Sequence, residues 1–192
     1  MPDTLIARSE LILGGQKSGK SRRAEQLAAA WLGASSLHGA VLIATAEAHD
    51  DEMRQRIARH QRERALRVPG LQTVEEPHDL AHAIGDVGGP QVLRVVDCLT
   101  LWLTGLLMPR EPASSSPERI GAKIEDVLRA IENSPGPIVL VGNEIGLGVI
   151  PLGQEVRAFV DMLGTLNQQV AERCERVCLM TAGLPLFLKG VS

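Results

Sequence analysis

The segment Gly14–Ser21 reads GGQKSGKS and constrains this chain more than any other, because a short apolar run precedes it and a helix-like stretch follows. Its spacing, G-x-x-x-x-G-K-[ST], is that of a phosphate-binding P-loop, which requires a strand before it and a helix after it. Gly14 and Gly19 let the backbone curl so that successive N–H groups point at phosphate oxygens. Lys20 then reaches the outer phosphates and Ser21 offers its hydroxyl to Mg²⁺. The alternative, a chance turn rich in glycine and serine, leaves both flanks unexplained. The predicted nucleotide contacts are Gly14, Gly15, Gln16, Lys17, Ser18, Gly19, Lys20 and Ser21.

Short apolar segments alternate with longer amphipathic ones along the chain, a rhythm typical of parallel strands joined by crossover helices. The apolar segments are continuous, which favours a sheet covered on both faces. We therefore expect an α/β, P-loop NTPase-like fold with a mostly parallel sheet, helices on both faces and a single domain over residues 1–192. The expected strands are Leu11–Leu13, Val41–Ala44, Val92–Val96, Ile138–Val141 and Val177–Met180. The expected helices are Ser21–Leu32, Asp50–Ala65, Pro77–Ile84, Leu99–Leu107, Pro117–Glu132 and Gln154–Arg173, with a Pro- and Ser-rich loop from Pro109 to Pro117.

Composition narrows the possible partners. The formal net charge is −3, and the chain has two Trp, two Phe and no Tyr, so we expect no nucleic-acid binding. The apolar runs are too short to cross a bilayer and the first residues lack an apolar signal core, so we expect no membrane insertion and a cytoplasmic location. The three cysteines are typical of reduced, packed thiols, and a metal pair at Cys174 and Cys178 is disfavoured because no further ligand stands nearby.

Asp97 ends the run Leu93–Asp97, which reads LRVVD. A P-loop enzyme needs a carboxylate to hold Mg²⁺ or its water, and Asp97 is the candidate. By itself, an apolar run that ends in Asp is often only the end of a strand, but downstream of a P-loop the metal role is favoured. The two motifs together predict phosphoryl chemistry and leave the substrate open.

His60 lies among arginines in the helix expected after the second strand. Arg56, His60 and Arg64 recur at four-residue spacing and so share one helix face. A neutral imidazole nitrogen can attack phosphorus while arginines hold the phosphate, which makes His60 a candidate nucleophile. The residues alone favour a solvated helix face, and both interpretations stay open at this point.

The segment Asn143–Pro151 reads NEIGLGVIP and follows the fourth expected strand. The carboxyl ends of parallel strands meet at one edge of a sheet, so this segment is expected beside the P-loop. Its glycines permit a backbone path close to a ligand, and Glu144 could accept a proton or a hydrogen bond. A tight connection into the next helix explains the segment equally well.

Four segments, GGQKSGKSRRAE, IATAEAHDDEMRQRIARH, VDCLTLWLTGLL and GNEIGLGVIP, occur in this order over nearly the whole chain. In them the chain resembles the bifunctional adenosylcobinamide kinase / adenosylcobinamide-phosphate guanylyltransferase family. The resemblance implies phosphorylation of the hydroxyl on the aminopropanol arm of adenosylcobinamide, followed by transfer of GMP from GTP to that phosphate, which gives adenosylcobinamide-GDP. It also implies GTP and ATP as substrates, Mg²⁺ as cofactor, and a homotrimer in which neighbouring subunits help to complete the site.

The resemblance also implies roles for single residues. The family carries the guanylyl group on the histidine of an R-I-x-x-H element, which is His60 here, so the implied catalytic residues are His60, Lys20 and Asp97. Besides the P-loop, the implied nucleotide contacts are Ala44, Thr45, Ala46, Gln61, Arg62, Glu63, Arg64, Glu75 and Asp97, and the implied metal ligands are Ser21 and Asp97. The chain departs from the family pattern at Lys17, where Arg is common, at Gly105, where Asn is common, and at Val160, where Arg is common.

Two other functions fit the motifs. A small-molecule kinase would use only γ-phosphoryl transfer and would form no covalent nucleotidyl enzyme. A nucleotide-dependent switch or ATPase would turn hydrolysis into a change of shape.

Overall fold

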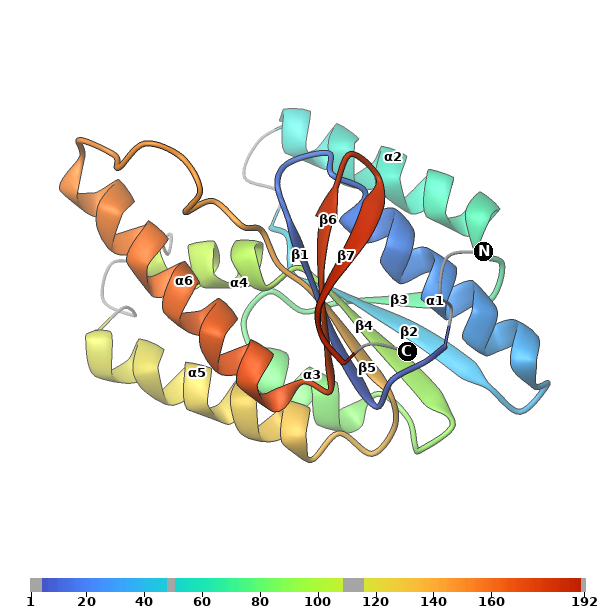
Figure 1. The fold of residues 1–192 in the computed structure, drawn as a ribbon. Coiled ribbons are helices and arrows are strands. Elements are labelled where there is room, and N and C mark those ends of the chain that lie inside the picture. Colours follow the sequence, from blue (N-terminus) through green and yellow to red (C-terminus); the bar gives the residue numbers. More distant parts are fainter. Residues whose placement is uncertain (1–4, 48–50, 109–115, 191–192) are drawn as a thin grey trace.

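The computed structural model describes residues 5–47, 51–108 and 116–190, and their centre is one sheet in the order β3-β2-β4-β5-β1-β6-β7 (Figure 1). Neighbouring strands are parallel, except that β7 runs antiparallel to β6. This confirms the α/β fold and the mostly parallel sheet. The strands are β1 Ser9–Gly14, β2 Gly39–Ala44, β3 Leu71–Glu75, β4 Val92–Asp97, β5 Ile138–Val141, β6 Arg176–Thr181 and β7 Leu184–Lys189. The helices are α1 Lys20–Ala34, α2 Asp51–Arg67, α3 Leu80–Asp86, α4 Leu99–Leu107, α5 Pro117–Glu132 and α6 Gln154–Arg173.

Alternate residues of the central strands supply two hydrophobic cores. On β1, Leu11 and Leu13 pack into the core under α3, α4, α5 and α6, whereas Ile12 packs into the core under α1. All three side chains are buried. Helices therefore cover both faces of the sheet, and this explains why its central strands are continuously apolar. The helix α2 lies alongside α1 on the outside of that layer (Figure 1).

Some elements differ from the sequence-based expectation. The helix expected from Pro77 begins at Leu80, because the Glu76 carboxylate accepts the N–H groups of His78 and Asp79, and Asp79 then caps the helix through the His82 N–H. The strands β3 and β7 were not expected. They are the two edges of the sheet, and their side chains are mostly exposed, so neither has a continuous apolar run. The expected helix start at Asp50 and residues 109–115 of the expected loop lie outside the described residues.

The strand order brings two motifs to one edge of the sheet. The strand β5 lies between β1 and β4, and Val141 is level with Ile12 on one side and with Asp97 on the other. The P-loop leaves the carboxyl end of β1, and Asp97 is the last residue of β4. Both motifs therefore open at the same edge, where parallel sheets bind ligands.

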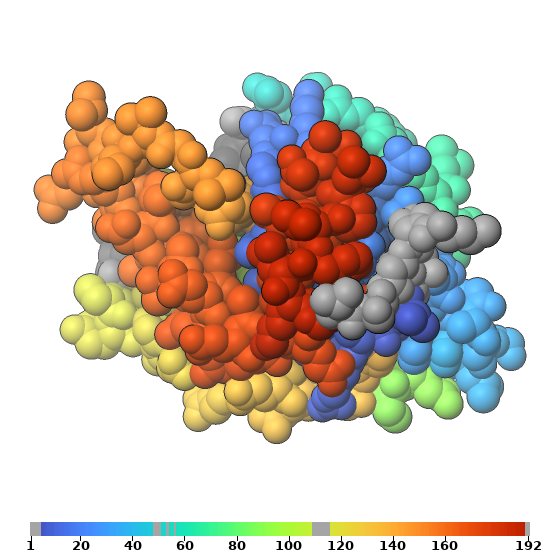
Figure 2. All heavy atoms as spheres, in the orientation of Figure 1, coloured from blue at the N-terminus to red at the C-terminus, as the bar shows by residue number. Residues whose placement is uncertain are grey.

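The segment from Gly142 to Gly153, which joins β5 to α6, stands out from the body of the molecule (Figure 2). It carries four strongly exposed apolar side chains, Leu147, Val149, Ile150 and Leu152, which are 76 to 98 % exposed. Among the residues that the structure describes, no helix is long and apolar enough to cross a membrane.

Arg94 holds together the amino end of β4. Its side chain is fully buried, and its guanidinium donates to the backbone carbonyls of Ile84, Gly88, Gly89 and Val92. Burial lowers the pKa of this guanidinium. A cation in the middle of an apolar strand is thus explained by the carbonyl oxygens that surround it.

We predict that Arg94→Leu lowers the free energy of unfolding by about 3 kcal/mol, because it leaves buried carbonyl groups without donors. Urea denaturation measures the loss. The control is Arg129→Ala, which removes an exposed ion pair with Asp126 and should cost less than about 1 kcal/mol. Equal losses in the two variants would contradict the role of Arg94.

Candidate functional site

The P-loop is held in shape by glycines and by the turn between β6 and β7. Gly14 has φ +151° and Gly19 has φ +106°, conformations that side-chain-bearing residues seldom adopt. A Cβ on Gly14 would lie 2.5 Å from the Met180 carbonyl oxygen. On the other side, the Ser18 carbonyl accepts the Gly183 N–H at 3.0 Å. The loop between β1 and α1 is therefore clamped against β6 and the turn after it.

Lys20 points along the inside of the P-loop. Its ammonium donates to the carbonyls of Gly14 at 2.9 Å and Gly15 at 2.7 Å, and the residue is 8 % exposed. Burial lowers the pKa of Lys20, whereas the negative charges available at Cys98 and Asp97 raise it. The lysine thus lies within electrostatic reach of the end of β4.

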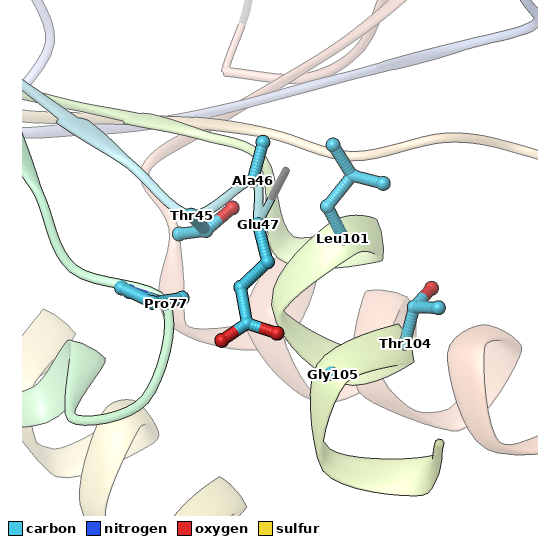
Figure 3. Close-up of a pocket in the computed structure, with 7 residues that line it drawn as sticks. All are labelled: Thr45, Ala46, Glu47, Pro77, Leu101, Thr104 and Gly105. Atoms are coloured by element: carbon cyan, nitrogen blue, oxygen red, sulfur yellow. The ribbon is translucent and has the colours of Figure 1, made fainter. Parts of the chain in front are cut away.

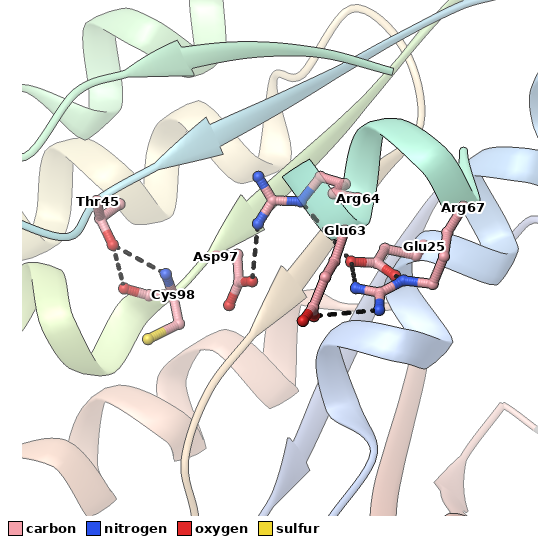
Figure 4. A network of polar contacts seen from close by, with 7 residues as sticks. All are labelled: Glu25, Thr45, Glu63, Arg64, Arg67, Asp97 and Cys98. Atoms are coloured by element: carbon pink, nitrogen blue, oxygen red, sulfur yellow. Dashed lines mark hydrogen bonds and ion pairs between the residues drawn. The ribbon is translucent and has the colours of Figure 1, made fainter. Parts of the chain in front are cut away.

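Asp97 is the meeting point of the three elements β4, α1 and α2. Its carboxylate lies 3.9 Å from Nη2 of Arg64 on α2 (Figure 4), and Ser21 of α1 is close enough to act on its pKa. Burial raises the pKa of the Asp97 carboxyl, whereas the charge of Arg64, the Ser21 hydroxyl and the charge of His60 lower it. Burial has the largest effect, so this carboxyl is more readily protonated than an ordinary one.

Two arginines tie α2 to α1 through one buried acid, Glu25. The Glu25 carboxylate accepts from Arg67 at 2.7 and 3.0 Å and lies 3.7 Å from Nε of Arg64 (Figure 4). Arg67 also pairs with Glu63 at 3.5 Å. Arg64 is buried and stands between Glu25 and Asp97. This ion network fixes α2 over the P-loop edge of the sheet. The sequence analysis missed Glu25, although an acid among the alanines and leucines of α1 was a detectable signal.

His60 lies on α2, one helical turn before Arg64, and its side chain is exposed. Residues four apart share a helix face, so His60 lies on the side of α2 that carries Arg64, whose guanidinium reaches Asp97 at the end of β4. Arg62 is exposed on the same helix, and the side chain of Arg56 lies outside the described structure. The structure thus brings His60 to the edge where the P-loop opens.

A cavity of about 260 Å³ lies between α2 and the carboxyl ends of β2 and β3. The Gln61 amide donates to the Glu75 carboxylate at 2.8 Å inside it. Its lining residues are Ala44, Ala46, Arg54, Ile57, Ala58, Gln61 and Glu75. The cavity therefore gathers several of the residues that the family resemblance connects with the nucleotide.

Thr45, which the same resemblance connects with the nucleotide, is buried and joins β2 to the end of β4. Its hydroxyl donates to the Cys98 carbonyl at 2.7 Å and accepts the Cys98 N–H at 2.8 Å (Figure 4). This pair of hydrogen bonds fixes the Ala44–Glu47 segment relative to Asp97. Local sequence patterns do not predict this pair of hydrogen bonds, because its two residues are 53 positions apart.

Ser21 and Asp97 form a donor set suited to Mg²⁺. Hydroxyl and carboxylate oxygens are the ligands that this ion prefers, and Mg²⁺ usually keeps its remaining positions for phosphate oxygens and water. Both side chains lie beside the P-loop, because Ser21 is the last residue of the motif and acts on the pKa of Asp97. The described residues contain no group of three or more His, Cys, Asp or Glu side chains placed to hold a metal. Ser21 and Asp97 therefore fit a metal that is shared with a bound nucleotide.

The segment after β5 begins against the P-loop, since Glu144 N–H donates to the Gly14 carbonyl at 3.1 Å. The Glu144 carboxylate accepts the Gly146 N–H at 2.8 Å and so shapes its own turn. The Asn143 N–H donates to the Thr100 hydroxyl, and the Asn143 carbonyl accepts from the Asn167 amide. The segment is thus both a tight connection and a part of the edge at which the P-loop opens.

Comparisons with known proteins show the family to which the chain belongs. Residues 10–188 match the family model described as cobinamide kinase / cobinamide phosphate guanyltransferase. The chain is 48 % identical over 181 residues to the bifunctional adenosylcobalamin biosynthesis protein CobP of Pseudomonas aeruginosa, covering 94 % of this chain and 97 % of that protein. It is 33 % identical to the bifunctional adenosylcobalamin biosynthesis protein CobU of Escherichia coli and 31 % identical to that of Salmonella typhimurium. Each of these two alignments covers 93 % of this chain and 98 % of the relative.

We predict that Gly14→Ala disrupts the P-loop, because its methyl group meets the Met180 carbonyl and its φ is unfavourable for alanine. The expected loss is about 2–4 kcal/mol of unfolding free energy, together with weaker nucleotide binding. Gly15→Ala is the matched control, since a Cβ there meets no atom within 4 Å. Thermal unfolding and nucleotide titration of both variants test the prediction, and equal behaviour would contradict it.

We predict that Asp97→Asn abolishes phosphoryl transfer while it stabilises the fold. Because burial raises the pKa of Asp97, the stability supplied by the protonated carboxyl is complete below its unfolded pKa and is lost as pH rises through the raised pKa. Asparagine stays neutral, so the variant should unfold with a free energy on the order of 1 kcal/mol higher at pH 7, and the difference should vanish toward acid pH. Urea denaturation across pH measures this, and a variant less stable than the wild type at pH 7 would contradict it.

Proposed function

Because this chain belongs to the cobinamide kinase / cobinamide phosphate guanyltransferase family, whose members are bifunctional enzymes, we propose that one nucleotide site serves both of its reactions. The observation that carries the proposal is the network of Arg64 with Asp97 and Glu25, which holds the His60-bearing helix α2 over the P-loop edge. A plain kinase site needs the P-loop and Asp97 but not a histidine there.

In the kinase reaction, the hydroxyl of the aminopropanol arm of adenosylcobinamide attacks the γ-phosphorus of ATP or GTP. The new P–O bond forms as the bond from the γ-phosphorus to the bridging oxygen breaks, and the hydroxyl proton passes to solvent water. Lys20 and the N–H groups of the P-loop hold the phosphates in line. Ser21 and Asp97 would hold Mg²⁺, which would supply positive charge to the phosphate oxygens.

In the guanylyltransferase reaction, an imidazole nitrogen of His60 attacks the α-phosphorus of GTP, a P–N bond forms and pyrophosphate leaves. A phosphate oxygen of adenosylcobinamide phosphate then attacks the same phosphorus, and the P–N bond breaks. The products are adenosylcobinamide-GDP and unmodified His60. Two easier displacements thus replace one difficult transfer.

The nucleotide base would occupy the cavity that Gln61 and Glu75 line. Glu75 can accept hydrogen bonds and Gln61 can both donate and accept them, which suits a base with polar edges. The contact between the two side chains supports this placement, because it holds two polar groups together at the cavity. Ala44 and Ala46 leave room on the opposite wall.

We also propose that the chain works as a single domain within a cytoplasmic homotrimer. The exposed apolar side chains of Leu147, Val149, Ile150 and Leu152 support an assembly, because contiguous apolar surface of this kind is typical of protein interfaces. The segment starts beside the P-loop, so a neighbouring subunit bound there would reach the site. The free thiols of Cys98, Cys174 and Cys178 support a reducing compartment.

The variant His60→Ala should retain kinase activity within a few-fold and lose guanylyl transfer by at least about 10³-fold, because it removes only the nucleophile. Separate assays measure phosphorylated cobinamide with ATP, and adenosylcobinamide-GDP with GTP and the phosphorylated substrate. The matched control is His82→Ala on α3, which removes an exposed histidine paired with Asp86.

Retention of both activities in His60→Ala would contradict the role of His60. If the wild type showed kinase activity alone, the chain would be a small-molecule kinase. Nucleotide hydrolysis that does not depend on a corrinoid would point to a switch or ATPase.

A further inference from the structure

A second cavity, of about 150 Å³, lies on the other side of the Ala44–Glu47 segment from the nucleotide cavity. It is formed by the end of β2, by Pro77 and by one side of α4 (Figure 3). Its lining residues are Thr45, Ala46, Glu47, Pro77, Leu101, Thr104 and Gly105. None of these residues except Thr45 and Ala46 has a role in the site described above.

The position of this cavity connects it with the reacting groups. Ala46 lines both cavities, so only the chain segment around it separates them. Thr45 is hydrogen-bonded to Cys98, the residue that follows Asp97. Leu101 follows on α4, and its N–H donates to the Cys98 sulfur. The cavity is thus built onto the same end of β4 that carries Asp97.

The lining suits a small, mostly aliphatic group. Pro77, Ala46 and Leu101 supply apolar surface, and the Thr104 hydroxyl is satisfied by the Thr100 carbonyl at 2.8 Å. The Glu47 carboxylate extends between Pro77 and α4, where it pairs with Nε2 of His78 at 3.0 Å (Figure 3). A carboxylate accepts several hydrogen bonds, so Glu47 can bind a further N–H group.

We propose that this cavity receives the aminopropanol arm of the corrinoid substrate, an inference that rests on the proposed function. The arm has a methyl group for the apolar wall, an amide N–H for Glu47 and a hydroxyl that is directed past Ala46 to the phosphates. The cavity is smaller than the roughly 300–1,000 Å³ of sites that enclose a whole drug-sized ligand. It therefore encloses the arm, and the corrin ring stays outside.

Gly105 gives the sharpest test, because it lines the cavity on α4 and a Cβ there meets no atom within 4 Å. Gly105→Leu fills the cavity and also suits a helix better than glycine does. The Michaelis constant for adenosylcobinamide in the kinase assay should rise about tenfold or more. The affinity for GTP and guanylylation without corrinoid should stay at the wild-type level.

The matched control is Gly121→Leu on α5, another helical glycine with open space at its Cβ. It should leave the Michaelis constants for adenosylcobinamide and for the nucleotide unchanged. A second pair of variants tests the carboxylate: Glu47→Ala should weaken cobinamide binding, and Glu47→Gln should restore it because an amide oxygen also accepts a hydrogen bond. His78→Ala removes the contact with Glu47 but keeps the Glu47 carboxylate as an acceptor, so cobinamide binding should stay near the wild-type level in this variant.

An unchanged Michaelis constant for adenosylcobinamide in active Gly105→Leu and Glu47→Ala proteins would overturn the cavity assignment and leave the proposed function intact. A rise in the Michaelis constant for the nucleotide as well as that for adenosylcobinamide would also overturn the assignment, since the cavity would then belong to the nucleotide site. Failure of the wild type to phosphorylate adenosylcobinamide would instead refute the proposed function on which the inference rests.

Discussion

The site depends on one buried arginine, Arg64, which stands between Glu25 of α1 and Asp97 of β4. A single charge on α2 is thereby shared by an acid of α1, the helix that follows the P-loop, and by an acid at the end of β4. Loss of Arg64 would leave the Asp97 carboxylate without this partner, which is costly in a low-dielectric interior. Its geometry, rather than the apolar packing of α2, sets where His60 lies. Arg67 adds a second attachment to Glu25, so rotation of α2 about its axis is also restricted.

The network also relates the stability of the fold to the chemistry of the site, because it includes Asp97. Asp97 is half-buried, and its partial burial raises its pKa against the opposing effects of Arg64, Ser21 and His60. An ionised carboxylate at position 97 therefore lowers the stability of the fold. A neutral side chain would serve the fold better, which favours a functional role for Asp97. Lys20 shows the complementary case, because burial lowers the pKa of its ammonium beside the P-loop carbonyls. Opposed charges in a partly dry pocket are suited to phosphates, whose charge they balance with little rearrangement.

The sequence predicted the central sheet because β1, β4 and β5 are buried on both faces. Their apolar runs can be recognised without knowledge of the fold. It did not predict β3 and β7, since edge strands with exposed side chains have no such pattern. The P-loop was visible because its spacing is local, and so was Asp97 at the end of an apolar run. The Glu25 network and the Thr45–Cys98 clamp were not, because their partners are far apart in the chain and meet only in the fold. The residues alone left His60 open between a nucleophile and a solvated helix face; the family resemblance favours the nucleophile, and this role stays a prediction.

Mass spectrometry of the intact protein after incubation with GTP and Mg²⁺, without corrinoid, tests the central claim most directly. We predict the addition of one GMP, labile in acid as a phosphoramidate is, that peptide mapping assigns to His60 and that is absent from His60→Ala. A wild-type protein that binds GTP but stays unmodified, or an adduct on another residue, would contradict the claim that the Arg64 network places His60 at the nucleotide site as the nucleophile.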